Sequence, residues 1–250
     1  KHGVNVAVLE AYRAGSGSTA ASTALLLQEP DLDLVSLSKR YGPAGSRRIS
    51  GLSFGAARNL ARSFKDEEVA CDLLYRDSVY YTKSVERARL LRRELEVRRK
   101  AGLPGEWLSP RRVREITGLT AAGAIRTRGN AQLNPYRACL GLIASAGRAG
   151  AAIFERSRVR RIQQRANGVR LQTQRGTVDA ATVIIATGYA TREFRPLAGR
   201  FRMRHTFVAA TNPLTRSQRK DLGLGDVMLW DTERPYHYVR WTPDHRLLLG

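Results

Sequence analysis

An acidic residue, Glu10, directly follows the first apolar stretch of the sequence. A carboxylate at the C-terminal end of a strand in a dinucleotide-binding unit can accept hydrogen bonds from both hydroxyls of a ribose. Each such charge-assisted bond contributes about 1.5–3 kcal/mol. The same charge would repel a 2′-phosphate. The alternative is that Glu10 only marks the point where a strand meets water.

The loop after Glu10 is built from small residues, namely Gly15, Ser16, Gly17, Ser18 and Thr19. Peptide N–H groups of such a loop can approach phosphate oxygens closely, because no bulky side chain holds the anion away. A glycine- and serine-rich stretch is also typical of a flexible linker. Taken alone, the loop leaves both interpretations open.

Tyr236, Tyr238 and Arg240 occupy alternate positions of one expected strand, so the three side chains should share a face. A guanidinium on that face could bind a substrate carboxylate with two parallel hydrogen bonds, and the tyrosines could form the walls of a pocket. His237 should point the other way. The alternative is a polar sheet face in contact with solvent.

The sequence predicts no metal site. Cys71 and Cys139 lie far apart and in no CxxC arrangement, and the four histidines do not pair with them at metal-ligand spacing. Two lone cysteines suit a reducing compartment, so we expect a cytoplasmic protein. No apolar run is long enough to span a membrane.

Strands and helices alternate along the chain. Apolar runs over residues 4–9, 151–154 and 182–188 predict strands buried on both faces. Shorter strands are expected over 159–162, 169–173 and 177–179, with hairpin turns at Asn167-Gly168 and Arg175-Gly176. Helices are expected over 51–64, after Ser84, after Ser109-Pro110 and after Asn134-Pro135. This order predicts an α/β fold with antiparallel material inserted into it.

The chain is strongly basic, with 43 Lys and Arg against 22 Asp and Glu and a formal charge of +21 over 250 residues. Such a charge raises the possibility of nucleic-acid binding. The cations are mostly arginines spread along the chain, and the densest stretch, residues 87–100, is interleaved with leucines as in a solvated helix. We therefore expect no nucleic-acid partner. The rival interpretation is a basic α/β nucleic-acid-binding protein without cofactor.

Four stretches, in order, resemble the D-amino-acid oxidase and sarcosine oxidase-like family of FAD-dependent oxidoreductases. They are VAVLEAYRAGSGSTAASTALL, LNPYRACLGLIASAGRAGAAIFERSRVRRI, GVRLQTQRGTVDAATVIIATGY and RPYHYVRWTPDHRLLLG. The resemblance covers nearly the whole chain. It implies that Glu10 holds the adenosine ribose of FAD and that residues 15–19 lie along the pyrophosphate and flavin. It also implies that the Val159 backbone meets adenine and that Thr187-Gly188 end the strand that returns beneath the cofactor.

The sequence departs from the family pattern in three places. Family members begin with a strand and a G-x-G-x-x-G turn about 20 residues before the acidic residue, and this sequence starts after that turn. Members also continue past residue 250, so we interpret the sequence as a fragment. Some relatives carry a histidine near Thr19 that attaches the flavin, whereas Ala20, Ala21 and Ser22 stand here, which implies non-covalent FAD.

The resemblance implies an incomplete Rossmann-like FAD-binding domain, formed by residues 1–70 and 130–192. An interleaved antiparallel substrate domain, truncated, is formed by residues 71–129 and 193–250. The implied activity is hydride transfer from the C–H next to an amine, or less often a hydroxyl, of an amine or amino-acid substrate to FAD. We expect the fragment alone to be inactive, and a truncated remnant of the flavoenzyme is the third interpretation.

Overall fold

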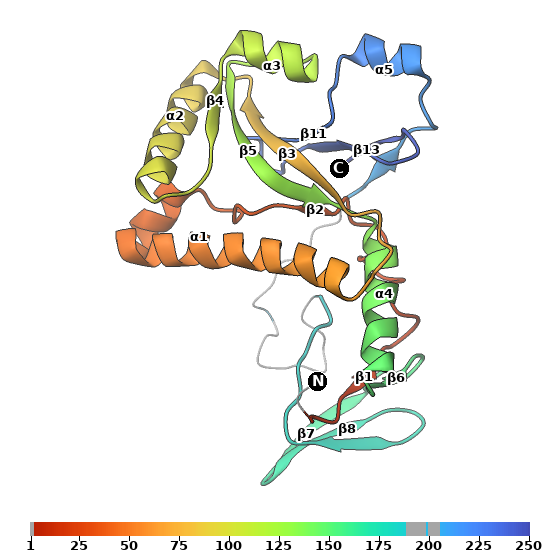
Figure 1. Cartoon of the computed structure of the whole chain (residues 1–250). Coiled ribbons are helices and arrows are strands. Elements are labelled where there is room, and N and C mark those ends of the chain that lie inside the picture. The colour runs from red at the N-terminus through yellow and green to blue at the C-terminus, as the bar shows by residue number, and fades with distance from the viewer. Residues whose placement is uncertain (1–2, 189–198, 200–205) are drawn as a thin grey trace. The chain divides into compact units, whose positions relative to one another are not determined.

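The computed structural model describes residues 3–188, 199 and 206–250 (Figure 1). The chain forms two compact units, each discontinuous in sequence. Unit 1 comprises residues 1–22 and 135–206, and unit 2 comprises residues 23–134 and 207–250. In the described part of the chain, no helix is long and apolar enough to cross a membrane.

Unit 1 pairs the beginning of the sequence with a distant segment. Its elements are β1 (Ala7–Leu9), α4 (Pro135–Arg148), β6 (Ala152–Phe154), β7 (Arg161–Arg165), β8 (Gly168–Gln172) and β9 (Thr177–Ala180). Strands β1 and β6 are parallel, with Leu9 opposite Phe154. Strands β7, β8 and β9 form an antiparallel sheet joined by the two predicted hairpins.

The three predicted buried strands of unit 1 all differ from the structure. Strand β6 forms, but Ala152 is exposed and Phe154 is 46% exposed. Strand β1 begins at Ala7, and Val4 is 74% exposed. Residues 182–186 form no strand, Thr187 and Gly188 lie in a bend, and Ile184 is 87% exposed. An apolar run becomes a buried strand only where a neighbouring strand satisfies its backbone groups. The described part of unit 1 gives β1 one neighbour, β6, and gives the 182–188 run none.

Unit 2 is built around one large mixed sheet. Its strands are β2 (Leu25–Leu26), β3 (Leu74–Thr82), β4 (Glu106–Leu108), β5 (Gly123–Gln132), β10 (Ala209–Ala210), β11 (Val227–Asp231), β12 (Tyr238–Trp241) and β13 (Leu247–Leu249). The order is β10-β13-β12-β11-β3-β5-β2, with β4 pairing with β5. Strands β11 and β3 are parallel, and the other neighbours are antiparallel.

The helices of unit 2 are α1 (Leu34–Asp66), α2 (Val85–Lys100), α3 (Pro110–Thr117) and α5 (Arg216–Leu222). The predicted caps are present. The Ser84 side chain accepts from Arg87 N at 3.2 Å, and Ser109 accepts from Arg112 N with Pro110 in the first turn. Helix α3 ends at Gly118, whose φ of 70° is the left-handed conformation that glycine adopts without strain.

Two apolar clusters stabilise the sheet of unit 2. One gathers Val79, Leu108, Val113, Ala121, Ala124, Val227 and Leu229, and the other Tyr80, Leu91, Leu95, Ile125 and Trp230. Neighbouring residues of β3, Val79 and Tyr80, belong to different clusters because successive side chains of a strand point to opposite faces.

The boundary between the units differs from the predicted domain ranges. Residues 23–70, assigned from the sequence to the FAD-binding domain, lie in unit 2. The physical reason is two sets of contacts: Leu25 and Leu26 extend the sheet beside β5 by backbone pairing, and the Leu34 N–H donates to the side-chain carboxylate of Glu94 on α2. Which unit holds cofactor and which holds substrate stays a prediction.

Candidate functional site

Glu10 stands where the parallel pair β1 and β6 ends. Its N–H donates to the Phe154 carbonyl at 2.9 Å, which extends the pairing by one residue. One carboxylate oxygen, Oε1, accepts from Tyr12 N at 2.8 Å. The other, Oε2, has no partner among the described residues, and the side chain is half-buried. Glu10 therefore presents a fixed carboxylate that can accept further hydrogen bonds.

The segment that contains Val159 runs beside Glu10. Ser157 N donates to the Glu10 carbonyl at 2.7 Å. Val159 is half-buried and precedes β7, so it lies in a connection rather than in the predicted strand over residues 159–162. The structure thus brings Glu10 and the Val159 segment together, as a shared nucleotide site requires.

The start of the small-residue loop is held by contacts within unit 1. Gly15 has a φ of 73°, and a Cβ there would lie 3.0 Å from Cδ2 of Tyr136 on α4. Ala14 N donates to Oε1 of Glu155 at 2.7 Å. Glycine at position 15 therefore avoids a strained conformation and a close contact with the Tyr136 ring.

The same loop holds three peptide N–H groups, those of residues 17–19, that could bind phosphate oxygens. Ala20, Ala21 and Ser22 each donate from N, at 3.2 Å, to the carbonyls of Gly17, Ser18 and Thr19 respectively. The N–H groups of residues 17–19 precede these turns and have no acceptor within the described residues. A Cβ on Gly188 would lie 3.9 Å from the Ser18 hydroxyl, which places Gly188 beside the loop. Peptide N–H groups in a turn of this kind are donors of the type that binds phosphate oxygens.

In unit 2, four rings form what we call the aromatic cluster: Tyr80, Trp230, Tyr236 and Tyr238. Tyr80 stacks on Trp230 with centroids 3.8 Å apart, and Tyr236 lies 5.7 Å from Trp230 and 5.9 Å from Tyr238. Burial raises the pKa of all three tyrosines. At neutral pH their hydroxyls are therefore protonated.

Charges of both signs lie around the aromatic cluster. The Arg234 guanidinium carbon is 3.9 Å from the Tyr236 ring centroid. The Tyr236 hydroxyl donates to the Asp31 carbonyl at 3.1 Å, and the charges of Asp31 and Asp33 act on Tyr236 to raise its pKa further, opposed by Arg234. A cation and two carboxylates near protonated tyrosines suit a zwitterionic ligand.

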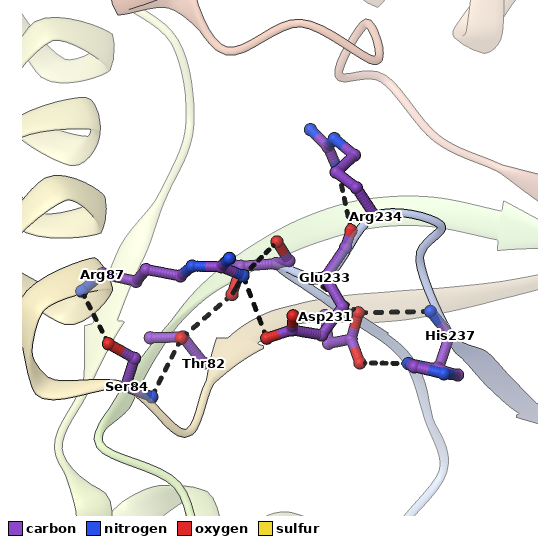
Figure 2. Close-up of polar contacts among 8 residues, drawn as sticks. Thr82, Ser84, Arg87, Asp231, Glu233, Arg234 and His237 are labelled. Carbon is purple, nitrogen blue, oxygen red and sulfur yellow. Dashed lines mark hydrogen bonds and ion pairs between the residues drawn. The ribbon is translucent and has the colours of Figure 1, made fainter.

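Asp231 fixes the turn that presents Arg234. Its Oδ1 accepts from Glu233 N at 3.0 Å and from His237 N at 3.1 Å, and its Oδ2 lies 2.7 Å from His237 Nδ1 (Figure 2). Figure 2 shows Arg234 extending away from this pair. His237 is thus bound to Asp231, whereas Tyr236 and Tyr238 contact each other.

A second set of bonds ties the turn to β3 and α2. Arg87 Nη1 donates to the Thr232 carbonyl at 2.7 Å and to Glu233 Oε1 at 2.9 Å (Figure 2). The Thr232 hydroxyl donates to Thr82 Oγ1 at 2.9 Å. Together with the Asp231–His237 pair, these bonds hold the residues on both sides of Arg234 and Tyr236.

Arg240 occupies a different environment from the tyrosines. It is 4% exposed, and its guanidinium donates to the backbone carbonyls of Thr23, Leu133 and Trp241. Burial lowers its pKa to about 10, so it is a cation at neutral pH. The predicted binding of a substrate carboxylate by Arg240 does not fit this position, because the guanidinium already donates to these carbonyls. Arg240 instead joins three segments of unit 2.

Replacing Arg240 by Lys should lower the free energy of unfolding by about 1–3 kcal/mol, because an ammonium cannot reach all three carbonyls and leaves a buried acceptor unpaired. Urea unfolding of the full-length protein measures the change. The control is Arg216→Lys on the exposed face of α5, expected to be neutral. Unchanged stability with a raised KM would instead favour the binding of a substrate carboxylate by Arg240.

Sequence reasoning missed Arg234 and Asp231. A signal for Arg234 was present, since it shares the alternating series of Tyr236, Tyr238 and Arg240. No local pattern indicated the pairing of Asp231 with His237, which depends on the conformation of the intervening turn.

The chain has a mixed α/β fold with several sheets and places a carboxylate, Glu10, at the end of a parallel strand pair. The profile of the FAD dependent oxidoreductase family matches residues 1–250. The chain belongs to this family, whose cofactor is FAD, as the sequence predicted.

Known proteins resemble the chain over nearly all of its length. It is 26% identical to gamma-glutamylputrescine oxidoreductase of Escherichia coli (strain K12), across 99% of this chain and 59% of that protein. Glycine oxidase from Geobacillus kaustophilus has a similar structure, with a TM-score of 0.76 at 21% identity over 98% of this chain and 64% of that one. L-proline dehydrogenase from P. horikoshii gives a TM-score of 0.71 at 18% identity, covering 99% and 63%. The chain spans about six tenths of the length of these relatives.

Proposed function

We propose that the protein containing this chain is an FAD-dependent oxidoreductase that oxidises an amine or amino acid at the C–H next to nitrogen. The family match over all 250 residues carries this proposal. The geometry around Glu10 supports it, because the carboxylate, the loop N–H groups and the Val159 segment form a donor and acceptor set that fits the nucleotide half of FAD.

In this proposal Glu10 accepts hydrogen bonds from the adenosine ribose, and the backbone of Val159 meets the adenine. The N–H groups of the loop over residues 15–19 bind the pyrophosphate, and Thr187 and Gly188 lie beneath the cofactor. When bound, FAD supplies the hydride acceptor. The residues Ala20, Ala21 and Ser22 carry no nucleophile of the histidine type, which supports non-covalent attachment.

The substrate side of the proposal rests on the aromatic cluster. Arg234 would bind the carboxylate of an amino acid through its planar fork of N–H groups, and the Tyr236 and Tyr238 rings would enclose the carbon skeleton. Asp31 and Asp33 would favour the cationic amine. A substrate with both charges satisfies both sets of residues.

The test uses the full-length protein purified with a flavin supplement. We expect flavin absorbance that acid precipitation releases into the supernatant, and substrate-dependent bleaching of that absorbance with amino acids. Arg234→Gln should raise KM for amino acids and leave KM for amines without a carboxylate nearly unchanged. A protein that retains no flavin would refute the proposal.

We also propose that the protein works in the cytoplasm without nucleic acid as a partner. Cys71 and Cys139 are both free thiols, which suits a reducing compartment. Cell fractionation tests the compartment. Tight RNA or DNA binding that falls steeply with salt would favour the rival class.

A further inference from the structure

A hollow in the surface of unit 2 lies between the C-terminal half of α1 and the strands β3 and β5. It encloses about 470 Å³, within the range of about 300–1,000 Å³ typical of small-molecule sites. We call it the basic groove. Its lining residues are Gln28, Phe54, Arg58, Arg62, Lys65, Tyr75, Arg128 and Gly129. Four of these are cations and none is a carboxylate.

Three of the cations lie on one face of α1. Arg58, Arg62 and Lys65 follow a spacing of four and three residues, which places them in one row about 10 Å long. All three are exposed, and no carboxylate pairs with them in the part of the chain that the structure describes. Like charges at this spacing repel each other. An anion bound along the row would relieve that repulsion.

The fourth cation comes from a bulge in β5. The register between β3 and β5 shifts so that Arg76 faces Asn130 and Ser78 faces Thr127, which leaves Arg128 and Gly129 outside the regular pairing. The buried Gln28 side chain donates from Nε2 to the Arg128 carbonyl at 3.1 Å and fixes the bulge. Arg128 also contacts Glu106 at 3.2 Å in an exposed pair, which a stronger anion can displace.

Two rings position the cations. Lys65 Nζ lies 4.6 Å from the Tyr75 ring centroid, and the Arg58 guanidinium carbon lies 5.3 Å from that of Phe54. These contacts restrict the long side chains and lower the entropy lost on binding. Because a cation already covers each ring, neither ring is free to stack on a nucleotide base. The groove therefore offers mainly N–H donors and positive charge.

We propose that the basic groove binds a small polyanion through its phosphate groups, the chemistry shared by inorganic polyphosphate and the phosphate chain of a nucleoside triphosphate. Four cations line one hollow of about 470 Å³, so they match several adjacent negative charges better than a single one. The site lies within unit 2 and uses none of the residues assigned to FAD or to the amino-acid substrate. It is therefore independent of the proposed oxidoreductase function.

Isothermal titration of the full-length, flavin-loaded protein with tripolyphosphate tests the proposal. We expect one saturable site per chain. The double variant R58Q/R62Q should bind about tenfold more weakly or worse, since two charge-assisted contacts are lost. The matched control R89Q/R93Q removes two exposed arginines at the same spacing on α2, and we expect a change of less than about twofold from screened long-range charge alone. R128Q, on a different element, should also weaken binding.

Further measurements separate the sources of the anion. If ATP binds as tightly as tripolyphosphate, the site recognises the phosphate chain alone. If ATP binds more tightly, the site also recognises the nucleoside. Both results support the site. Circular dichroism checks that each variant folds. Equal weakening by R58Q/R62Q and R89Q/R93Q would overturn the proposal, because it would show that net charge alone binds the anion. A second result would also overturn the proposal: single-stranded RNA binds more tightly than tripolyphosphate, and both double variants weaken RNA binding equally. That result would favour an extended nucleic-acid surface.

Discussion

Replacing Glu10 by Gln should weaken the binding of FAD about 10- to 100-fold, because the loss of one charge-assisted bond to the ribose removes about 1.5–3 kcal/mol. The Tyr12 N–H donates to Glu10 Oε1 at 2.8 Å, and Gln retains a carbonyl oxygen that can accept this bond, so the local backbone should keep its conformation. Titration of the flavin-free full-length protein with FAD, followed by flavin fluorescence, measures the affinity.

FMN supplies the control for this variant. FMN lacks the adenosine ribose that Glu10 is proposed to hold, so its affinity should be the same for the wild type and for Glu10→Gln. Glu96→Gln, an exposed change on α2, should alter neither affinity. An equal loss for FAD and FMN would show that the substitution disturbs the fold around the flavin, and an unchanged FAD affinity would remove Glu10 from the site.

The sequence predicted those elements of the chain whose signals are local. The hairpins at Asn167-Gly168 and Arg175-Gly176 and the cap at Ser84 depend on backbone geometry within a few residues, and the structure confirms them. The start of α1 was missed. Its cap, Asp33, precedes an irregularity at Gly42 and Pro43, which interrupts the helical pattern before residue 51.

Features that depend on distant partners were not predictable in the same way. The apolar run over residues 182–188 has the composition of a buried strand, but a strand forms only beside another strand. Arg240 shares its alternating spacing with the tyrosines, but the carbonyls that bind it come from Thr23 and Leu133, far away in sequence. The alternating spacing indicated on which face of the strand a side chain should lie. It could not indicate which other segments of the chain would cover that face.

In the candidate site, too, the local features were predicted from the sequence and the long-range contacts were not. Glu10 and the small-residue loop were identified because both follow one strand directly. Their approach to the Val159 segment depends on the pairing of β1 with β6, which are separated by most of the chain. The FAD assignment from sequence therefore rested on the family resemblance for these long-range contacts.

A buried ionic network in unit 2 connects α1, α2 and the segment that contains Glu29. The Glu94 carboxylate, 3% exposed, accepts from Leu34 N at 2.9 Å and from Val35 N at 3.0 Å, and it also accepts from Arg98 Nε at 2.8 Å. Arg98 reaches Glu29 as well, at 3.3 Å. A single side chain thus satisfies the first N–H groups of α1 and neutralises a buried guanidinium.

Glu94→Ala should therefore lower the free energy of unfolding by about 3–5 kcal/mol, the range for removing one partner of a buried ion pair. Two buried N–H groups at the start of α1 would also lose their acceptor. Urea unfolding measures the total effect. Hydrogen exchange gives a local readout, in which the amides of Leu34 and Val35 should exchange much faster than in the wild type.

Two further variants separate charge from hydrogen bonding. Glu94→Gln keeps one carbonyl acceptor and loses the charge, so its destabilisation should fall between the wild type and Glu94→Ala. Glu96→Ala, two residues along α2 and exposed, should change stability by less than about 0.5 kcal/mol. If Glu94→Ala were as stable as Glu96→Ala, the network would not hold α1 against α2.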